Sequence, residues 1–363
     1  MNSDNQTRAF LLAHCQAYPR LELTDLFKAL YQSAYGCEHL VGDASAAAAY
    51  ITDEAASCKP HSGAVIEPLD GEYVRVHLDI LKDGLSADTF ARLFARSAEH
   101  HDGAKALLEE KLDVLLRLAA QGEIPFSLEA TRAAVDAWKK TGFPACHHSE
   151  TFRRAYAPAY RLMKADYARL LPLLSRIDAA LRDSDRVLLA LDGACASGKT
   201  TLAAFLQQLY GCPLFHMDDF FLRPEQRTPE RYAEPGGNVD RERFLAEVLI
   251  PLRAGETVQY RRFDCSTFTV LPPKPIAAGR LNVIEGTYSL HPDLEKQYDL
   301  SAVLKISPNL QRERIIMRNG VEMAQRFFDT WIPLEERYFN ALVRTCAARW
   351  FSTDKFNFFH RKG

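Results

Sequence analysis

Two hydrophobic patterns divide the chain of 363 residues. In the first 165 residues, apolar residues recur at helical spacing, and this period predicts a mostly helical region. From residue 187 onwards, short apolar runs alternate with helical stretches, which predicts a parallel sheet with helices on both faces. The predicted strands of this sheet are 187–192, 213–217, 281–285, 301–306 and 348–352. The pattern therefore predicts an α/β domain that follows a mostly α-helical one.

The junction between the two domains is marked by a charged segment, Arg182–Arg186. It follows a helical stretch that we expect to be broken at Pro172, because proline interrupts helical hydrogen bonding. We assign residues 1–180 to the helical domain and its joining helix, and residues 181–363 to the α/β domain. One small β element is predicted at Val65–Val76, where an Asp-Gly turn lies between extended flanks.

A phosphate-binding loop follows the first predicted strand of the α/β domain, in the order that G-x-x-x-x-G-K-[ST] requires. Its residues are Gly193, Ala194, Cys195, Ala196, Ser197, Gly198, Lys199, Thr200 and Thr201. The backbone N–H groups of such a loop and the positive end of the next helix bind phosphate. We expect Lys199 to face solvent and to reach the β- and γ-phosphates of ATP, and the Thr200 hydroxyl to ligate Mg²⁺.

Carboxylates lie at the ends of two further predicted strands. Asp218 and Asp219 follow the strand 213–217, and Glu285 ends the strand 281–285. Ligands of parallel sheets bind beyond the carboxyl ends of the strands, so these side chains should meet near the loop. The aspartate pair could take a proton from an acceptor hydroxyl or hold Mg²⁺, and Glu285 is predicted to contact Mg²⁺, in part through water.

A basic helical segment after the strand 301–306 carries Arg312, Arg314 and Arg318. One interpretation is a mobile lid that excludes water, in which Arg312 and Arg318 neutralise the transferred phosphoryl group and Arg314 binds ATP. The other interpretation is a solvated basic helix face.

Polar clusters in the first half also allow two interpretations. The first is a core-facing aromatic stripe on one helix, with arginines in solvent; its members are Phe152, Tyr156 and Tyr160. The second is a metal or anion site, since imidazole and carboxylate suit a divalent ion. Its members would be His39, His77, His148 and Glu150.

Composition narrows the function classes. The formal net charge of −2 gives no reason to expect nucleic acid or an acidic membrane as a partner. No apolar run approaches a membrane span, and the first residues lack the basic and apolar regions of a signal peptide. Eight cysteines occur singly, without a C-x-x-C pair, as is typical of free thiols. We expect a cytoplasmic protein.

The motifs GACASGKTT, HMDDFF and IEGTY, with the arginine-bearing helix, resemble the uridine kinase, phosphoribulokinase and pantothenate kinase family of P-loop kinases. The DDFF run is also similar to nicotinamide riboside kinases. The resemblance covers about 186–350 and implies a P-loop kinase fold with a five-stranded parallel sheet, ATP and Mg²⁺ as cofactors, and phosphorylation of a small-molecule hydroxyl. It places Asp218 in the catalytic position.

The resemblance also suggests an acceptor pocket. It implies that Asp240 holds acceptor hydroxyls, and that a hairpin over 261–268, with Arg262 and Asp264, contacts the acceptor. Uridine kinases carry a tyrosine and a histidine on this hairpin, where we place Phe263 and Phe268. Phenylalanine forms no hydrogen bond, whereas arginines pair well with carboxylate or phosphate. We therefore expect an anionic acceptor rather than uridine or cytidine.

The function predicted from these features is ATP-dependent phosphorylation of a small-molecule hydroxyl, with an altered acceptor pocket. An alternative is a nucleotide-dependent switch or regulatory ATPase that controls binding by the first domain. A homo-oligomer is compatible with either function.

Overall fold

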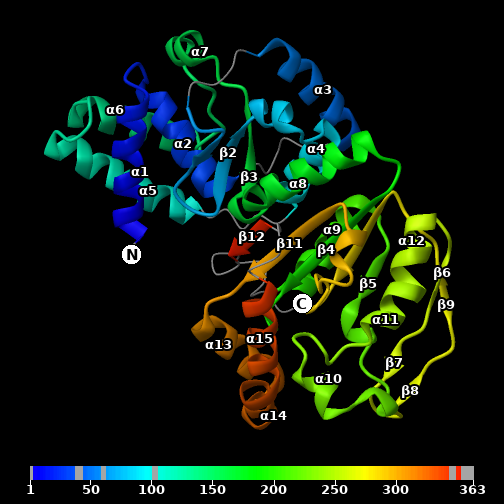
Figure 1. Cartoon of the computed structure of the whole chain (residues 1–363). Helices are drawn as coiled ribbons and strands as arrows, with labels where there is room; N and C mark the ends of the chain where they lie inside the picture. The colour runs from blue at the N-terminus through cyan, green and yellow to red at the C-terminus, as the bar shows by residue number, and fades with distance from the viewer. Residues whose placement is uncertain (1–2, 37–43, 59–62, 100–104, 343–348, 353–363) are drawn as a thin grey trace. The chain divides into compact units, whose positions relative to one another are not determined.

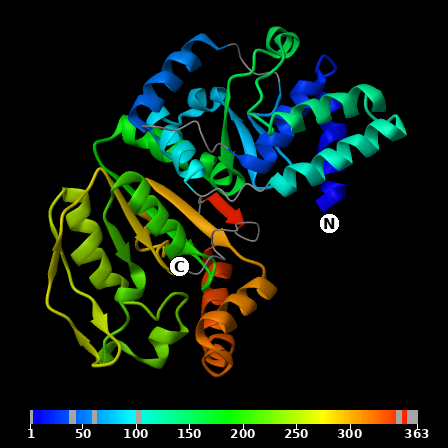
Figure 2. The same cartoon turned by 180° about the vertical axis from the view of Figure 1, so that it is seen from behind.

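The computed structural model describes residues 3–36, 44–58, 63–99, 105–342 and 349–352. The chain forms two compact units, Met1–Asp178 and Ala179–Gly363 (Figures 1 and 2). Helix α8 (Ala165–Asp183) carries the chain from the first unit into the second. None of the helices within the described ranges is both long and apolar enough to cross a membrane.

The first unit combines helices with a small antiparallel sheet of order β1-β2-β3. Its other helices are α1 (Ser3–Ala17), α2 (Leu23–Tyr35), α3 (Ala44–Ser57), η1 (Leu78–Asp83), α4 (Ala87–Ala98), α5 (Lys105–Gln121), α6 (Leu128–Lys140) and α7 (Glu150–Tyr156). Its strands are β1 (Ile66–Pro68), β2 (Tyr73–His77) and β3 (Tyr160–Lys164). The predicted hairpin at 65–76 is confirmed, because Ile66 pairs with Val76. Apolar side chains of α1, α2, α5 and α6 form the main core of this unit.

Strand β3 corrects the prediction of one helical aromatic stripe. Helix α7 ends at Tyr156, and Tyr160 begins β3 instead of continuing the helix. Ala157 has a left-handed backbone with φ of 44°, and Pro158 has no N–H to donate to a helix, so the helix stops there. Phe152 is buried in the core as the first interpretation expected.

The predicted break at Pro172 is wrong. Helix α8 continues through this residue for its full length. Leu171 and Leu174 are fully buried on either side of the proline. Packing of this apolar face outweighs the hydrogen bond that proline removes, because most of a helix's stability in a protein comes from tertiary burial.

The second unit is built on a parallel sheet of strand order β12-β11-β4-β10-β5. The strands are β4 (Val187–Gly193), β5 (Leu214–His216), β10 (Leu281–Glu285), β11 (Leu300–Lys305) and β12 (Arg349–Ser352). Strand β4 is buried along its whole length between β10 and β11. Strands that are buried on both faces consist of nearly continuous apolar runs, and for this reason they could be predicted from the sequence.

Helices cover both faces of this sheet. Helix α9 (Lys199–Tyr210) packs on β4 and β10, and the segment α11 (Arg241–Phe244), η4 (Leu245–Leu249) and α12 (Ile250–Ala254) supplies apolar side chains to the other face. The sequence prediction of a parallel sheet with two covered faces is confirmed. The ribbon of β6 (Val258–Tyr260) and β9 (Lys274–Ile276) runs beside α12 (Figure 1).

The remaining elements of the second unit connect or follow these strands and helices. They are η2 (Met217–Asp219), η3 (Pro224–Gln226), α10 (Pro229–Ala233), β7 (Phe263–Asp264), β8 (Thr269–Val270), η5 (Glu295–Gln297), α13 (Pro308–Asn319), α14 (Val321–Arg326), the π-helical segment η6 (Phe327–Trp331) and α15 (Ile332–Leu342). The predicted hairpin over 261–268 corresponds to β7 and β8, in which Phe263 pairs with Val270.

Candidate active site

The phosphate-binding loop connects β4 to α9, and its lysine is buried. Gly193 has a φ of 149°, and a Cβ atom there would lie 2.5 Å from the carbonyl oxygen of Leu304, so this position requires glycine. Lys199 is 7% exposed, and its Nζ donates to the carbonyl oxygens of Gly193 at 2.8 Å and Ala194 at 3.0 Å. The expectation that Lys199 faces solvent is wrong, because its ammonium ties the two ends of the loop together.

Asp192 connects the start of this loop to the segment that follows β10 and to α15. Its carboxylate accepts hydrogen bonds from the Tyr338 hydroxyl at 2.6 Å and from the N–H groups of Gly193 at 2.6 Å, Leu290 at 2.9 Å and Tyr288 at 3.2 Å. Burial raises the pKa of Asp192, while these donors oppose the shift. Tyr288 has a φ of 78°, which is uncommon for an aromatic residue. Asp192 therefore holds a strained segment beside the loop.

Oxygen ligands suited to Mg²⁺ meet where β10 ends. The Thr200 hydroxyl donates to the two oxygens of Glu285 at 3.2 and 3.3 Å, and His216 Nδ1 lies 2.6 Å from Glu285 Oε1. Mg²⁺ prefers such oxygen ligands and usually keeps several waters. Thr200 and Glu285 thus fit the predicted metal site. The hydrogen bond to Glu285 raises the pKa of His216, which keeps the imidazole donating to this carboxylate.

The two adjacent aspartates have different surroundings. Asp219 accepts from the Tyr260 hydroxyl at 2.8 Å and from Arg262 Nε at 2.9 Å. Asp218 lines the pocket, and within the described part of the chain no group hydrogen-bonds its carboxylate. Asp218 is exposed to the pocket, and partial desolvation by the surrounding protein raises the pKa of its carboxylate. Asp218 is therefore the aspartate available for chemistry.

Side chains of α13 and α15 grip the backbone of the loop. Gln311 Nε2 donates to the carbonyl oxygen of Cys195 at 3.0 Å, and Arg314 donates to that of Ala196 at 3.1 Å. The N–H of Cys195 donates to Glu335 Oε2 at 2.9 Å. Burial raises the pKa of Glu335, although Lys199 opposes the shift. Helices α13 and α15 therefore hold the loop by both its N–H and its carbonyl groups.

The three arginines of α13 have different positions. Arg314 and Arg318 line the pocket. Arg312 is exposed and lies over the ring of Phe328, 4.2 Å from its centre, so it does not line the pocket. The geometry supports a phosphate-side position for Arg314 and Arg318 and gives no support to a catalytic role for Arg312.

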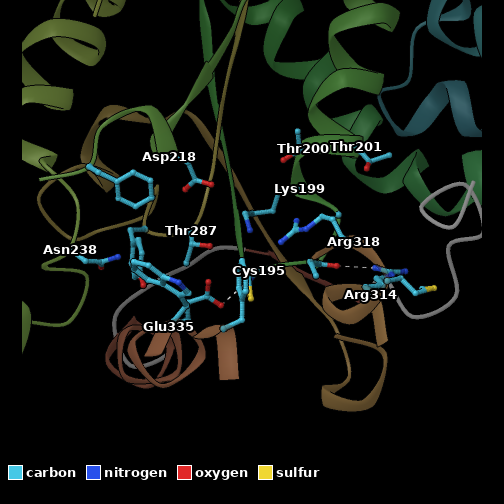
Figure 3. A pocket seen from close by; sticks show the side chains of 17 residues that line it. Cys195, Lys199, Thr200, Thr201, Asp218, Asn238, Thr287, Arg314, Arg318 and Glu335 are labelled. Carbon is cyan, nitrogen blue, oxygen red and sulfur yellow. Dashed lines mark hydrogen bonds between the residues drawn. The ribbon is translucent and has the colours of Figure 1, made fainter. Parts of the chain in front are cut away.

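The pocket has a volume of about 740 Å³ and separates opposite charges. Its cations are Lys199, Arg314 and Arg318, and its acids are Asp218 and Glu335. Figure 3 shows Asp218, Asn238 and Glu335 on one side, Arg314 and Arg318 on the other, and Lys199 with Cys195 between them. The other lining residues are Ala196, Gly198, Thr200, Thr201, Phe221, Thr287, Tyr288, Met317, Phe327 and Trp331.

The residues that the resemblance assigned to the acceptor do not line this pocket. The Asp240 carboxylate is 1% exposed, accepts from the N–H of Arg243 and caps α11. Asp264 accepts from Ser266 within its own turn. Arg262 pairs with Asp219, as described above, and is largely exposed. Its neighbour Arg261 is hydrogen-bonded to Glu247. Both hairpin arginines therefore have carboxylate partners on the protein itself.

The polar residues of the first unit form a buried hydrogen-bonded network. His148 Nδ1 lies 2.9 Å from Asp25 Oδ1 and its Nε2 lies 2.7 Å from the Tyr160 hydroxyl. Burial lowers the pKa of His148 to about 4. His77 Nε2 lies 3.5 Å from Glu67 Oε2. Both histidines therefore contact polar side chains inside the first unit.

The predicted metal or anion site is not formed by those of its members that the structure describes. Glu150 is exposed and pairs with Arg154. His39 lies outside the described residues. Throughout the described ranges, no group of three or more histidine, cysteine, aspartate or glutamate side chains is arranged to hold a metal ion.

No family model and no curated protein matches the sequence. Among solved structures, a possible uridine kinase from Bacillus stearothermophilus is 21% identical, with a TM-score of 0.36 over 50% of this chain and 100% of its own. A protein assigned as a fructose transport system kinase from Silicibacter sp. TM1040 is 24% identical, with a TM-score of 0.40 over 52% and 96%. A D-glycerate 3-kinase from Cryptococcus neoformans is 15% identical, with a TM-score of 0.34 over 52% and 93%.

The second unit has a P-loop fold. This assignment follows from strand β4, the loop, helix α9 and the parallel sheet themselves. The similar structures cover about half of the chain and leave the rest unmatched. Their low identities and TM-scores say nothing about activity, which must be argued from the site.

Sequence reasoning missed several residues of the site. Asn238, Tyr288 and Glu335 line the pocket, and Asp192 accepts a hydrogen bond from the backbone N–H of Tyr288. Asp192 could have been found, since it is the one charged residue of an otherwise apolar strand. Glu335 had no such signal, because it lies in an ordinary amphipathic helix more than 130 residues after the loop.

Proposed function

We propose that this protein is a kinase that transfers the γ-phosphoryl group of ATP to a hydroxyl of a small molecule. The observation that carries the proposal is the position of Asp218, whose carboxylate has no hydrogen-bond partner among the described residues and lines the same pocket as Lys199 and Thr200. A carboxylate beside the phosphate-binding residues can orient an acceptor hydroxyl and accept its proton.

Binding of the nucleotide is assigned to the loop and to α13. The N–H groups at the start of α9 have no partner within that helix and would receive phosphate oxygens. Lys199, Arg314 and Arg318 add positive charge on the same side of the pocket. Thr200 and Glu285 would hold Mg²⁺, with Asp218 as a further oxygen ligand nearby. The metal ion, when bound, neutralises charge on the transferred phosphoryl group.

Asp218 orients the acceptor hydroxyl and accepts its proton during transfer. The acceptor oxygen forms a bond to the γ-phosphorus while the bond from that phosphorus to the β–γ bridging oxygen breaks, and ADP leaves. Lys199 and Arg318 stabilise the negative charge of the moving group. Desolvation raises the pKa of Asp218, which makes its carboxylate a stronger base for the proton of the acceptor hydroxyl.

The test is ADP formation by the full chain with ATP and Mg²⁺, measured with and without a cell extract of small metabolites. We expect the extract to raise the rate at least severalfold, and Asp218→Asn to abolish that rise while ATP still binds. Slow ADP formation that is indifferent to the extract would contradict the proposal and favour a nucleotide-dependent switch.

A further inference from the structure

The two sides of the pocket differ in charge in a way that bears on the acceptor. All of its cations, Lys199, Arg314 and Arg318, belong to the loop and to α13. The opposite side carries the carboxylates of Asp218 and Glu335. Because the acceptor hydroxyl must lie next to Asp218, the rest of the acceptor lies on this acidic side.

The remaining polar groups of the acidic side are uncharged. Asn238 and Tyr288 are buried, line the pocket and are joined by a hydrogen bond. Asp192 holds the backbone of Tyr288 in its left-handed conformation. Thr287 donates its hydroxyl to the carbonyl oxygen of Gly193. This wall is therefore preorganised, and it offers hydrogen bonds without positive charge.

The arginines that could have provided positive charge on the acceptor side are engaged elsewhere. Arg262 binds Asp219, Arg261 binds Glu247, and neither lines the pocket. Arg227 lies over the rings of Phe263 and Phe268, at 5.8 and 5.0 Å from their centres. An anionic acceptor would therefore face two carboxylates, and the nearest cation of the pocket, Lys199, is already hydrogen-bonded to the carbonyl oxygens of Gly193 and Ala194. Like charges in a pocket repel one another.

Glu335 contributes a negative charge to the acceptor side of the pocket. It is 6% exposed, and the Cys195 N–H fixes its orientation from the loop side. An ionised carboxylate only accepts hydrogen bonds, so it selects ligands that donate them, such as hydroxyl or ammonium groups. Removal of a buried charge that a ligand must pair with changes discrimination more than overall binding.

We propose that the acceptor is an alcohol without negative charge, either neutral or cationic, and that Glu335 is the residue that excludes anionic alcohols. The proposal rests on the kinase function proposed above. It replaces the expectation of an anionic acceptor, which relied on Arg261 and Arg262 facing the pocket.

The experiment separates a metabolite extract into cationic, neutral and anionic pools by ion exchange. Each pool is incubated with the full chain, Mg²⁺ and ATP labelled with ³²P at the γ-position, and label in new organic phosphates is counted. We expect the label in the neutral or cationic pool, in excess of the anionic pool by about tenfold or more. Label mainly in the anionic pool would overturn the inference but leave the kinase function standing. Absence of acceptor-dependent label in every pool would overturn the kinase function itself.

Glu335→Gln tests the assigned residue, and Glu336→Gln is its matched control. Glu336 is the next residue on α15 and is exposed, so the same substitution there leaves the pocket unchanged. We expect Glu335→Gln to reduce the preference for uncharged over anionic acceptors by about tenfold, and Glu336→Gln to retain it. If Glu335→Gln only tightened ATP binding and left the preference unchanged, Glu335 would compete with phosphate for the Cys195 N–H, and the assignment would be wrong.

Discussion

Asp218 and Asp219 are neighbours with opposite expected responses to the same substitution. In Asp218→Asn, an exposed carboxylate without a hydrogen-bond partner among the described residues becomes a neutral amide. Loss of a general base typically lowers turnover by about 10²–10⁴-fold, and ATP affinity should change little. Its stability should rise only slightly, because the substitution removes a partly desolvated charge that is still exposed to solvent in the pocket.

In Asp219→Asn, the amide retains an oxygen for the Tyr260 hydroxyl but loses the charge that strengthens this bond. Arg262 is largely exposed, so its ion pair adds little. We expect the free energy of unfolding to fall by about 1 kcal/mol, the difference between a charged and a neutral hydrogen bond. Turnover should stay within about tenfold of the wild type. The two substitutions thus change stability in opposite directions, and only Asp218→Asn is expected to lower turnover strongly.

The stability difference between the wild type and Asp218→Asn should also depend on pH. A carboxylate with a raised pKa in the folded state costs stability at neutral pH, and this cost disappears as the pH falls below that pKa. The stability gain of Asp218→Asn should therefore shrink on acidification. Native-state hydrogen exchange of the β4 amides measures the second unit alone. Equal losses of activity in the two variants, or destabilisation by Asp218→Asn, would refute the assignment of Asp218.

Three other predictions concern the loop and the first unit. Lys199→Ala should abolish transfer and also destabilise the second unit by about 2 kcal/mol, since two buried charge-assisted hydrogen bonds are lost; an unchanged exchange rate of the β4 amides would contradict the buried position. Gly193→Ala should abolish ATP binding in equilibrium dialysis, because its Cβ would meet a carbonyl oxygen at 2.5 Å. His148 has a pKa of about 4 in the folded protein, so the first unit should lose about 3 kcal/mol of stability between pH 6.5 and 4; exchange of the β2 amides that stays constant over this interval would exclude a neutral buried His148.

The strands of the second unit were predictable because local sequence patterns mark each of them. Strand β4 is an apolar run followed by a glycine-rich loop, and both signals are contiguous in sequence. The antiparallel partner β3 in the first unit was not predictable. Tyr160 continues a helical spacing from Phe152, and only the pairing of β3 with the distant strand β2 makes it a strand.

The site divides in the same way. Lys199 and Thr200 belong to a contiguous loop motif, and Asp218 lies just after a strand, so local sequence patterns were enough to predict these residues. The acceptor side depends on side chains that only the fold brings together, such as Glu335 of α15 beside the loop. Arg262 misled the prediction because a sequence displays its charge but not Asp219, the partner that neutralises it. Partners distant in the chain decide whether a charged residue serves a site or the surface.

The most direct measurement of the proposed phosphoryl transfer uses ATP labelled with ¹⁸O on the γ-phosphate. The full chain is incubated with this ATP, Mg²⁺ and a metabolite extract, and the products are analysed by mass spectrometry. We predict a new phosphate monoester that carries the heavy phosphoryl group and is missing with Asp218→Asn. Heavy oxygen found only in inorganic phosphate, at equal rates with and without the extract, would contradict the account.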